Sequence, residues 1–107
     1  MSYREELIPA PVDQICCFRV LDTDIQLLAA DGKKHIIAYY LDILQTLLDP
    51  KMFYRANRQH IVAFHAIKEL EHYSYRKMLL KLIPAHLEPL VISKAKASDF
   101  LSWMERH

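Results

Sequence analysis

The sequence predicts a mainly β domain, of the β-rich α+β class, with five to eight short strands and two short helices. Short runs of β-forming residues are separated by Pro, Asp and Ser, and one Asp-Gly pair stands between two apolar runs. Only two segments space their apolar residues as a helix does. At 107 residues, 52% hydrophobic and 25% charged, the chain has the composition of one globular domain.

The first eleven residues have the character of a linker or lead-in (1–11), and the domain itself is expected over residues 12–106. Pro9 and Pro11 interrupt the segment, which contains no apolar core of a signal peptide. No run in the chain approaches the roughly 18 apolar residues that a membrane span needs. We therefore expect a cytoplasmic protein without a membrane partner.

The first strand is expected over residues 14–20, QICCFRV, and it ends at the turn-forming residues 22–24. Cys16 and Cys17 lie within it, and adjacent cysteines rarely close a disulfide because the geometry is strained. We interpret both as small buried hydrophobic residues.

A β-hairpin is expected around Asp31-Gly32, which separates the apolar runs 25–30 and 33–40. A two-residue Asp-Gly loop is a strong hairpin signal because both central residues need positive φ. Gly32 is the only glycine of the chain, so the other turns depend on Pro, Asp and Ser.

The later elements follow from periodicity and breakers. Residues 41–48 show helical spacing and are stopped by Asp49-Pro50. Residues 58–70 are compatible with either strand or helix, a turn is expected near residues 73–74, and residues 78–83 and 90–92 favour strands.

A second helix is predicted over residues 94–106, with Ser93 as its N-cap. One stripe of this helix carries the apolar side chains expected to face the core, with Trp103 near the edge of the stripe. The stripe consists of Ala97, Phe100, Leu101 and Met104.

No enzyme site, cofactor or metal site is predicted. A single glycine cannot build a phosphate-cradling loop, and no serine has the flanking glycines of a hydrolase nucleophile. The six histidines lack the spacing with which ligands converge on zinc.

Positive charge and amide groups gather in two places instead. Residues 50–60 contain Lys51, Arg55, Arg58 and His60 without an acid, and an apolar run follows to residue 67. Such a segment suits contacts with phosphates or base edges, although a solvated basic loop has the same composition. The net charge is only +1, so a nucleic-acid partner would require the cations to gather on one face.

The motifs of residues 53–62, 67–70 and 91–94 closely resemble, in order and separation, those of the LytTR DNA-binding domain. This resemblance extends over almost the whole chain. It implies small antiparallel sheets with short helices, and function as the output domain of a bacterial two-component response regulator. It also implies sequence-specific binding of double-stranded DNA through loops between strands. Members commonly bind direct-repeat sites as side-by-side copies. The resemblance further implies a receiver domain upstream, which this sequence does not include.

The resemblance also assigns site residues by position. The turn over residues 22–25, with Asp24, matches the first contacting loop; Arg58 and Gln59 match the central loop; Lys94 matches the basic residue after the serine. Three further residues are expected as flanking phosphate contacts, namely Arg55, Asn57 and Lys96.

Several positions depart from the family pattern. Gln59 replaces the usual serine, Ala63 a frequent asparagine, and Lys94 the usual arginine. Lysine lacks the planar fork that binds guanine with two hydrogen bonds, so base discrimination there is expected to differ. The acids Asp22 and Asp24 would repel phosphate. Together with the near-neutral charge, they keep open the alternative of a protein-interaction module without DNA binding.

Overall fold

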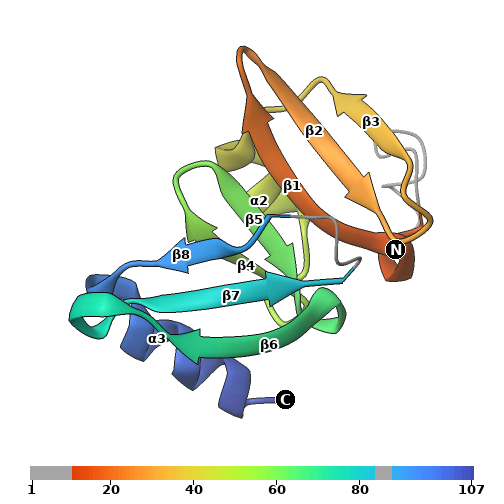
Figure 1. Ribbon diagram of the computed structural model, residues 1–107. Helices are drawn as coiled ribbons and strands as arrows, with labels where there is room; N and C mark the ends of the chain where they lie inside the picture. The colour runs from red at the N-terminus through yellow and green to blue at the C-terminus, as the bar shows by residue number, and fades with distance from the viewer. Residues whose placement is uncertain (1–10, 84–87) are drawn as a thin grey trace.

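The computed structural model describes residues 11–83 and 88–107, so the predicted lead-in lies outside the described residues except for Pro11. Within these ranges the chain forms a five-stranded and a three-stranded antiparallel sheet with two α-helices (Figure 1). The predicted mainly β fold class is therefore confirmed. In chain order the elements are η1 (Val12–Gln14), β1 (Ile15–Leu21), β2 (Asp24–Ala29), β3 (Lys34–Ile37), α2 (Leu41–Leu47), β4 (Phe53–Asn57), β5 (His60–Ala63), η2 (Phe64–Ala66), β6 (Ile67–His72), η3 (Ser74–Arg76), β7 (Met78–Leu82), β8 (Leu90–Ile92) and α3 (Lys94–Glu105).

Strand β1 lies at the centre of the five-stranded sheet, whose order is β3-β2-β1-β5-β4. Its first four residues are all buried, because the sheet and the elements packed on it cover both faces at this point. Cys16 and Cys17 are free and buried, which confirms their interpretation as core residues. Burial raises the pKa of the Cys17 thiol to about 12, so this thiol stays protonated at neutral pH.

The hairpin between β2 and β3 forms where the sequence predicts it, but its loop differs from the prediction. The N–H of Ala29 donates to the carbonyl of Lys33 (2.9 Å), and the N–H of Gly32 donates to the carbonyl of Ala29 (3.0 Å). The loop therefore has three residues, of which only Gly32 has positive φ (+88°). The expectation that Asp31 shares this conformation is wrong, because a type I turn followed by one left-handed glycine closes a three-residue loop.

The segments that were hard to assign from sequence form short strands around one helical turn. Residues 58–70 contain β5 and the first four residues of β6, and η2 between them carries the chain from the larger sheet to the smaller one. The N–H of Ile83 donates to the carbonyl of Ala66 in η2 (2.8 Å), so β7 also ends at this junction. Strand β4, which the sequence analysis did not predict, pairs antiparallel with β5.

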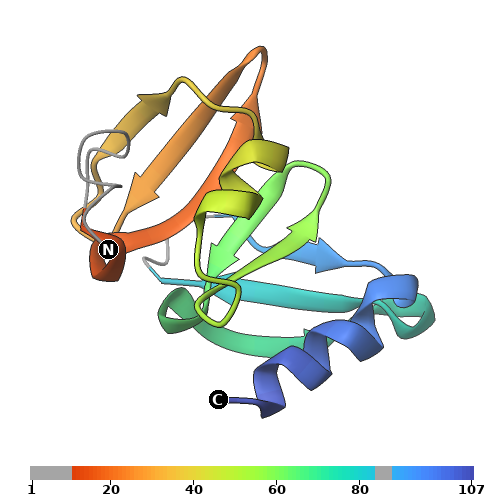
Figure 2. The same cartoon turned by 180° about the vertical axis from the view of Figure 1, so that it is seen from behind.

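The two helices pack beside the sheets, and Figure 2 shows both on the side facing the viewer. Helix α2 ends before Asp49-Pro50, as predicted, and buries Leu41 and Leu44. Helix α3 buries Phe100 and Trp103, whereas Leu101 is 40% exposed. The predicted stripe is therefore wrong at Leu101, and Trp103 lies inside the contact rather than at its edge.

Two hairpin tips contain non-glycine residues in the left-handed region. Asp22 at the β1–β2 tip has a φ of 57°, and at the β6–β7 tip Tyr75 and Arg76 have φ values of 55° and 65°. This conformation costs an L-residue about 1–2 kcal/mol.

Candidate nucleic-acid interface

The turn between β4 and β5 exposes two side chains on a braced backbone. Asn57 and His60 are paired across the two strands, and Arg58 and Gln59 form the tip, where both are exposed. The Oδ1 atom of Asn57 accepts a hydrogen bond from the N–H of Gln59 (2.8 Å) and lies 3.0 Å from Nδ1 of His60. An asparagine that bonds the backbone two residues later fixes the turn. The side chains of Arg58 and Gln59 are thus held outward.

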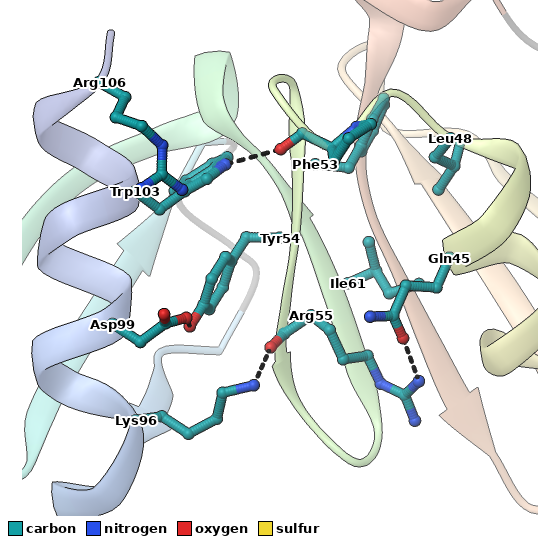
Figure 3. A pocket seen from close by; sticks show the side chains of 11 residues that line it. Gln45, Leu48, Phe53, Tyr54, Arg55, Ile61, Lys96, Asp99, Trp103 and Arg106 are labelled. Atoms are coloured by element: carbon teal, nitrogen blue, oxygen red, sulfur yellow. Dashed lines mark hydrogen bonds between the residues drawn. The ribbon is translucent and has the colours of Figure 1, made fainter.

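Arg55 supports the same turn through hydrogen bonds to its backbone. Its Nε donates to the carbonyl of Asn57 (2.8 Å), and its Nη2 donates to the carbonyl of Arg58 (2.7 Å). Its Nη1 donates to Oδ1 of Asp42 (2.9 Å) and to Oε1 of Gln45 (3.1 Å), both on α2. The side chain of Arg55 is only 18% exposed. Figure 3 shows its guanidinium directed toward Gln45. Most of its donors are therefore occupied inside the protein.

Lys96 joins α3 to the strand that carries this turn. Its Nζ donates to the carbonyl of Arg55 (3.0 Å, Figure 3) and lies 5.1 Å from the centre of the Tyr54 ring. The hydroxyl of Tyr54 donates to Oδ2 of Asp99, one turn further along α3. Burial, followed by this hydrogen bond, raises the pKa of Tyr54, so its hydroxyl remains a donor. The start of α3 is thereby fixed relative to β4.

Lys94 is the first residue of α3 and is exposed. Ser93 occupies the N-cap position, as predicted, but its side chain makes no capping hydrogen bond. Its carbonyl instead accepts hydrogen bonds from the N–H groups of Lys96 (3.0 Å) and Ala97 (2.9 Å). The side chains of Ser93 and Lys94 are thus both exposed at the start of the helix.

The β4–β5 turn and the start of α3 adjoin on one surface, where they line a shallow depression of about 330 Å³. Its lining residues are Arg55, Ala56, Asn57, Arg58, Ser93 and Lys96. Figures 1 and 2 show the β1–β2 tip, the β4–β5 tip and the start of α3 along one side of the molecule. The predicted site elements are thus two tips of the five-stranded sheet and the start of α3, which lie along one side of the fold.

The first predicted loop is acidic at its tip. Asp22 and Asp24 are both exposed, and Leu21 pairs with Asp24 so that Asp22 and Thr23 form the turn. Asp24 is the first residue of β2 and lies at the β1–β2 tip, apart from the depression shared by Arg58 and Lys96. The structure therefore places one acidic and two basic elements along the same side.

His60 contributes little charge to this surface. It is half-buried, and Arg19 is its cross-strand partner on β1. Burial, and then the positive charge of Arg19, lower the pKa of His60, so its imidazole is neutral at pH 7. The exposed cations of the turn and helix start are therefore Arg58 and Lys94.

Neither a candidate metal centre nor a candidate membrane-spanning helix occurs in the part of the chain that the structure describes. Residues 11–83 and 88–107 contain no group of three or more His, Cys, Asp or Glu side chains that could hold a metal ion. In the same part of the chain, no helix combines the length and apolar character needed to cross a bilayer.

Comparisons with known proteins agree with this architecture. The family model described as the LytTr DNA-binding domain matches residues 5–105. A solved structure from Bacillus cereus, the LytTr DNA-binding domain of a protein described as a methyl-accepting/DNA response regulator, superposes with a TM-score of 0.79 at 22% sequence identity. The match covers 89% of this chain and 84% of that chain. A comparison with curated proteins gave no match. The motif resemblance found in the sequence is confirmed, and the chain belongs to the LytTr DNA-binding domain family.

Proposed function

We propose that this chain binds double-stranded DNA with sequence specificity, as the output domain of a bacterial transcriptional response regulator. The observation that carries the proposal is the exposure of Arg58 and Lys94 on adjoining elements of a LytTr domain. A duplex is a continuous polyanion, so it can meet both cations only if they lie on one side of the protein.

The side chains at the tips differ in the contacts that they can make. Arg58 can bind a phosphate or the O6 and N7 atoms of guanine, and the amide of Gln59 matches the N6 and N7 atoms of adenine. Lys94 acts as a point charge, toward a phosphate or a guanine edge. Asp24 can accept a hydrogen bond from the amino group of cytosine, while it repels phosphate.

The other predicted residues play supporting parts in this proposal. Arg55, Asn57 and Lys96 hold the backbone around the β4–β5 tip, and they add positive charge or polar groups at its flank. We also propose side-by-side copies on direct-repeat sites, an upstream receiver domain and a cytoplasmic location, all of which rest on the family alone.

The experiment begins with selection of duplexes bound by the wild-type chain from a pool of random sequence. Arg58→Ala and Lys94→Ala are each expected to weaken binding to the selected duplex by about 1–3 kcal/mol. Lys33→Ala is the matched control, because Lys33 is exposed beyond the end of β2 opposite the β1–β2 tip. It should bind like the wild type.

Two results would contradict the proposal. Arg58→Ala and Lys94→Ala variants that both bind the selected duplex as tightly as Lys33→Ala would remove the site assignment. A wild-type chain that enriches no duplex, yet captures a protein partner in a complex stable to high salt, would support the protein-interaction alternative.

A further inference from the structure

The β6–β7 hairpin has an unusual tip. The N–H of Lys77 donates to the carbonyl of Ser74 (3.1 Å), and the two residues between them, Tyr75 and Arg76, both have left-handed φ. This is the pattern of a type I′ turn, in which Asn-Gly is strongly preferred. The chain places an aromatic and a cationic residue where such residues are strained. Strain of this kind is most often retained at sites of function.

The side chains of this tip are also available to a partner. Tyr75 is 86% exposed, and Arg76 and Lys77 are exposed as well. Within the described residues, none of these three side chains makes a hydrogen bond or an ion pair. The two acids of β6 form ion pairs with Lys81, whose Nζ lies 3.7 Å from Glu69 and 2.9 Å from Glu71.

The tip lies beside one of the proposed DNA-contacting elements. Arg76 and Lys94 line the same open depression of about 460 Å³ along α3. Figures 1 and 2 show the β6–β7 turn next to the start of α3, on the side where the other tips lie. Glu105 lines this depression too, but it lies eleven residues along α3 from Lys94, or about 16 Å at the helical rise. The end near Lys94 is therefore cationic.

We infer that the turn of residues 74–77 is a further DNA-contacting element, which rests on the function proposed above. Arg76 and Lys77 bind phosphates flanking the groove that Lys94 faces, and the Tyr75 hydroxyl donates to the same backbone. Phosphate is the partner that fits, because arginine, lysine and tyrosine are its usual donors and the tip presents no acid. Such contacts add affinity for any duplex without reading its sequence.

The double variant Tyr75→Asn/Arg76→Gly separates this role from a structural one. It supplies the residues that a type I′ turn favours, so its melting temperature is expected to rise by about 4–8 °C. Its affinity for the duplex selected by the wild-type chain is expected to fall about tenfold. The same loss is expected on an unrelated duplex. The slope of log affinity against log salt concentration should become shallower by about one, which corresponds to the loss of one phosphate contact.

Two single variants keep the test decisive if the double variant unfolds. Arg76→Gln should show the loss and the shallower salt dependence, whereas Arg76→Lys should retain most of the binding because it keeps the charge. Arg106→Gln is the matched control, since Arg106 is exposed at the opposite end of α3, and it should bind both duplexes like the wild type.

The outcomes distinguish this inference from the function on which it rests. If the wild type and Lys94→Ala differ on the selected duplex while Arg76→Gln binds like the wild type at every salt concentration, the inference is overturned and the proposed function stands. If the wild type binds no duplex, both are overturned.

Discussion

At the scale of single residues, the guanidinium of Arg55 is bound inside the protein. It donates to the carbonyls of Asn57 and Arg58 and to the side chains of Asp42 and Gln45. The ion pair with Asp42 contributes little by itself, because the carboxylate is 88% exposed and screened by water. The two bonds to backbone carbonyls matter more, since they set the direction of the tip. We propose that Arg55 positions Arg58 for DNA.

The effects of Arg55 and Arg58 on DNA binding are expected to be coupled. Arg55→Met should weaken binding to the selected duplex about tenfold, or about 1.4 kcal/mol, because the tip loses both carbonyl contacts. In an Arg58→Ala background the same change should weaken binding less than about twofold, since the side chain that Arg55 positions is gone. A double-mutant cycle of duplex affinities measures this coupling.

Arg55→Lys provides the control for charge. Lysine keeps the positive charge but cannot reach two carbonyls with a rigid fork, so it should not restore binding. Restoration by lysine, together with additive effects in the cycle, would instead identify Arg55 as a flanking phosphate contact.

The sequence predicted the exposure of some of these residues, but not the contacts of Arg55. Arg58, Gln59 and Lys94 are polar side chains in or next to turns, and their exposure follows from local pattern alone. Two of the hydrogen-bond partners of Arg55, Asp42 and Gln45, lie thirteen and ten positions earlier on α2. That proximity exists only after α2 has packed on the five-stranded sheet, so composition and spacing could not reveal it.

Among the elements, helix α3 has two overlapping apolar faces, and it buries only one of them against the sheets. Phe100 belongs to either face, Leu101 to one and Trp103 to the other. The fold selects Trp103, whose ring packs 5.2 Å from Tyr54 and 5.7 Å from Phe64 between ring centres. Its Nε1 donates to the carbonyl of Pro50 (2.8 Å), which satisfies the one polar group that burial would otherwise leave unpaired.

Truncation of a buried and of an exposed side chain on α3 should have unequal effects on stability. Trp103→Ala should reduce the free energy of unfolding by about 3–5 kcal/mol, because it opens a cavity and leaves the Pro50 carbonyl without its donor. Leu101→Ala should change it by less than about 1 kcal/mol, because its side chain already meets solvent. Urea denaturation of both variants measures the difference. Equal losses would mean that α3 packs through the stripe predicted from the sequence.

Elements bounded by turn or helix-breaking residues could be predicted from the sequence. A strand that is recognisable only by its pairing with another strand could not. The Asp31-Gly32 hairpin and the helix before Asp49-Pro50 formed where turn and breaker residues placed them. Strand β4 begins with the apolar pair of Phe53 and Tyr54, but Arg55 and Asn57 flank the small Ala56 in the rest of the strand, and only pairing with β5 identifies it as a strand. Its assignment depends on contacts with β5, which local periodicity does not report.

At the scale of the whole molecule, a chain with a net charge of +1 must separate its charges to meet a polyanion. Arg58, Lys94 and Arg76 belong to elements that lie on one side, while the exposed Lys33 and Lys34 lie at the opposite end of β2. The β1–β2 tip on the first side carries Asp22 and Asp24. This separation of charge is what the proposed binding of one duplex by Arg58, Lys94 and Arg76 requires.

The most direct test of the account is the salt dependence of duplex binding by the wild type and by the double variant Arg58→Ala/Lys94→Ala. The wild type should lose at least about tenfold in affinity between about 50 and 200 mM salt, and the double variant should bind more weakly with a shallower dependence. Wild-type affinity that does not change with salt, or a double variant that matches the wild type throughout, would contradict the claim that these two residues meet one duplex.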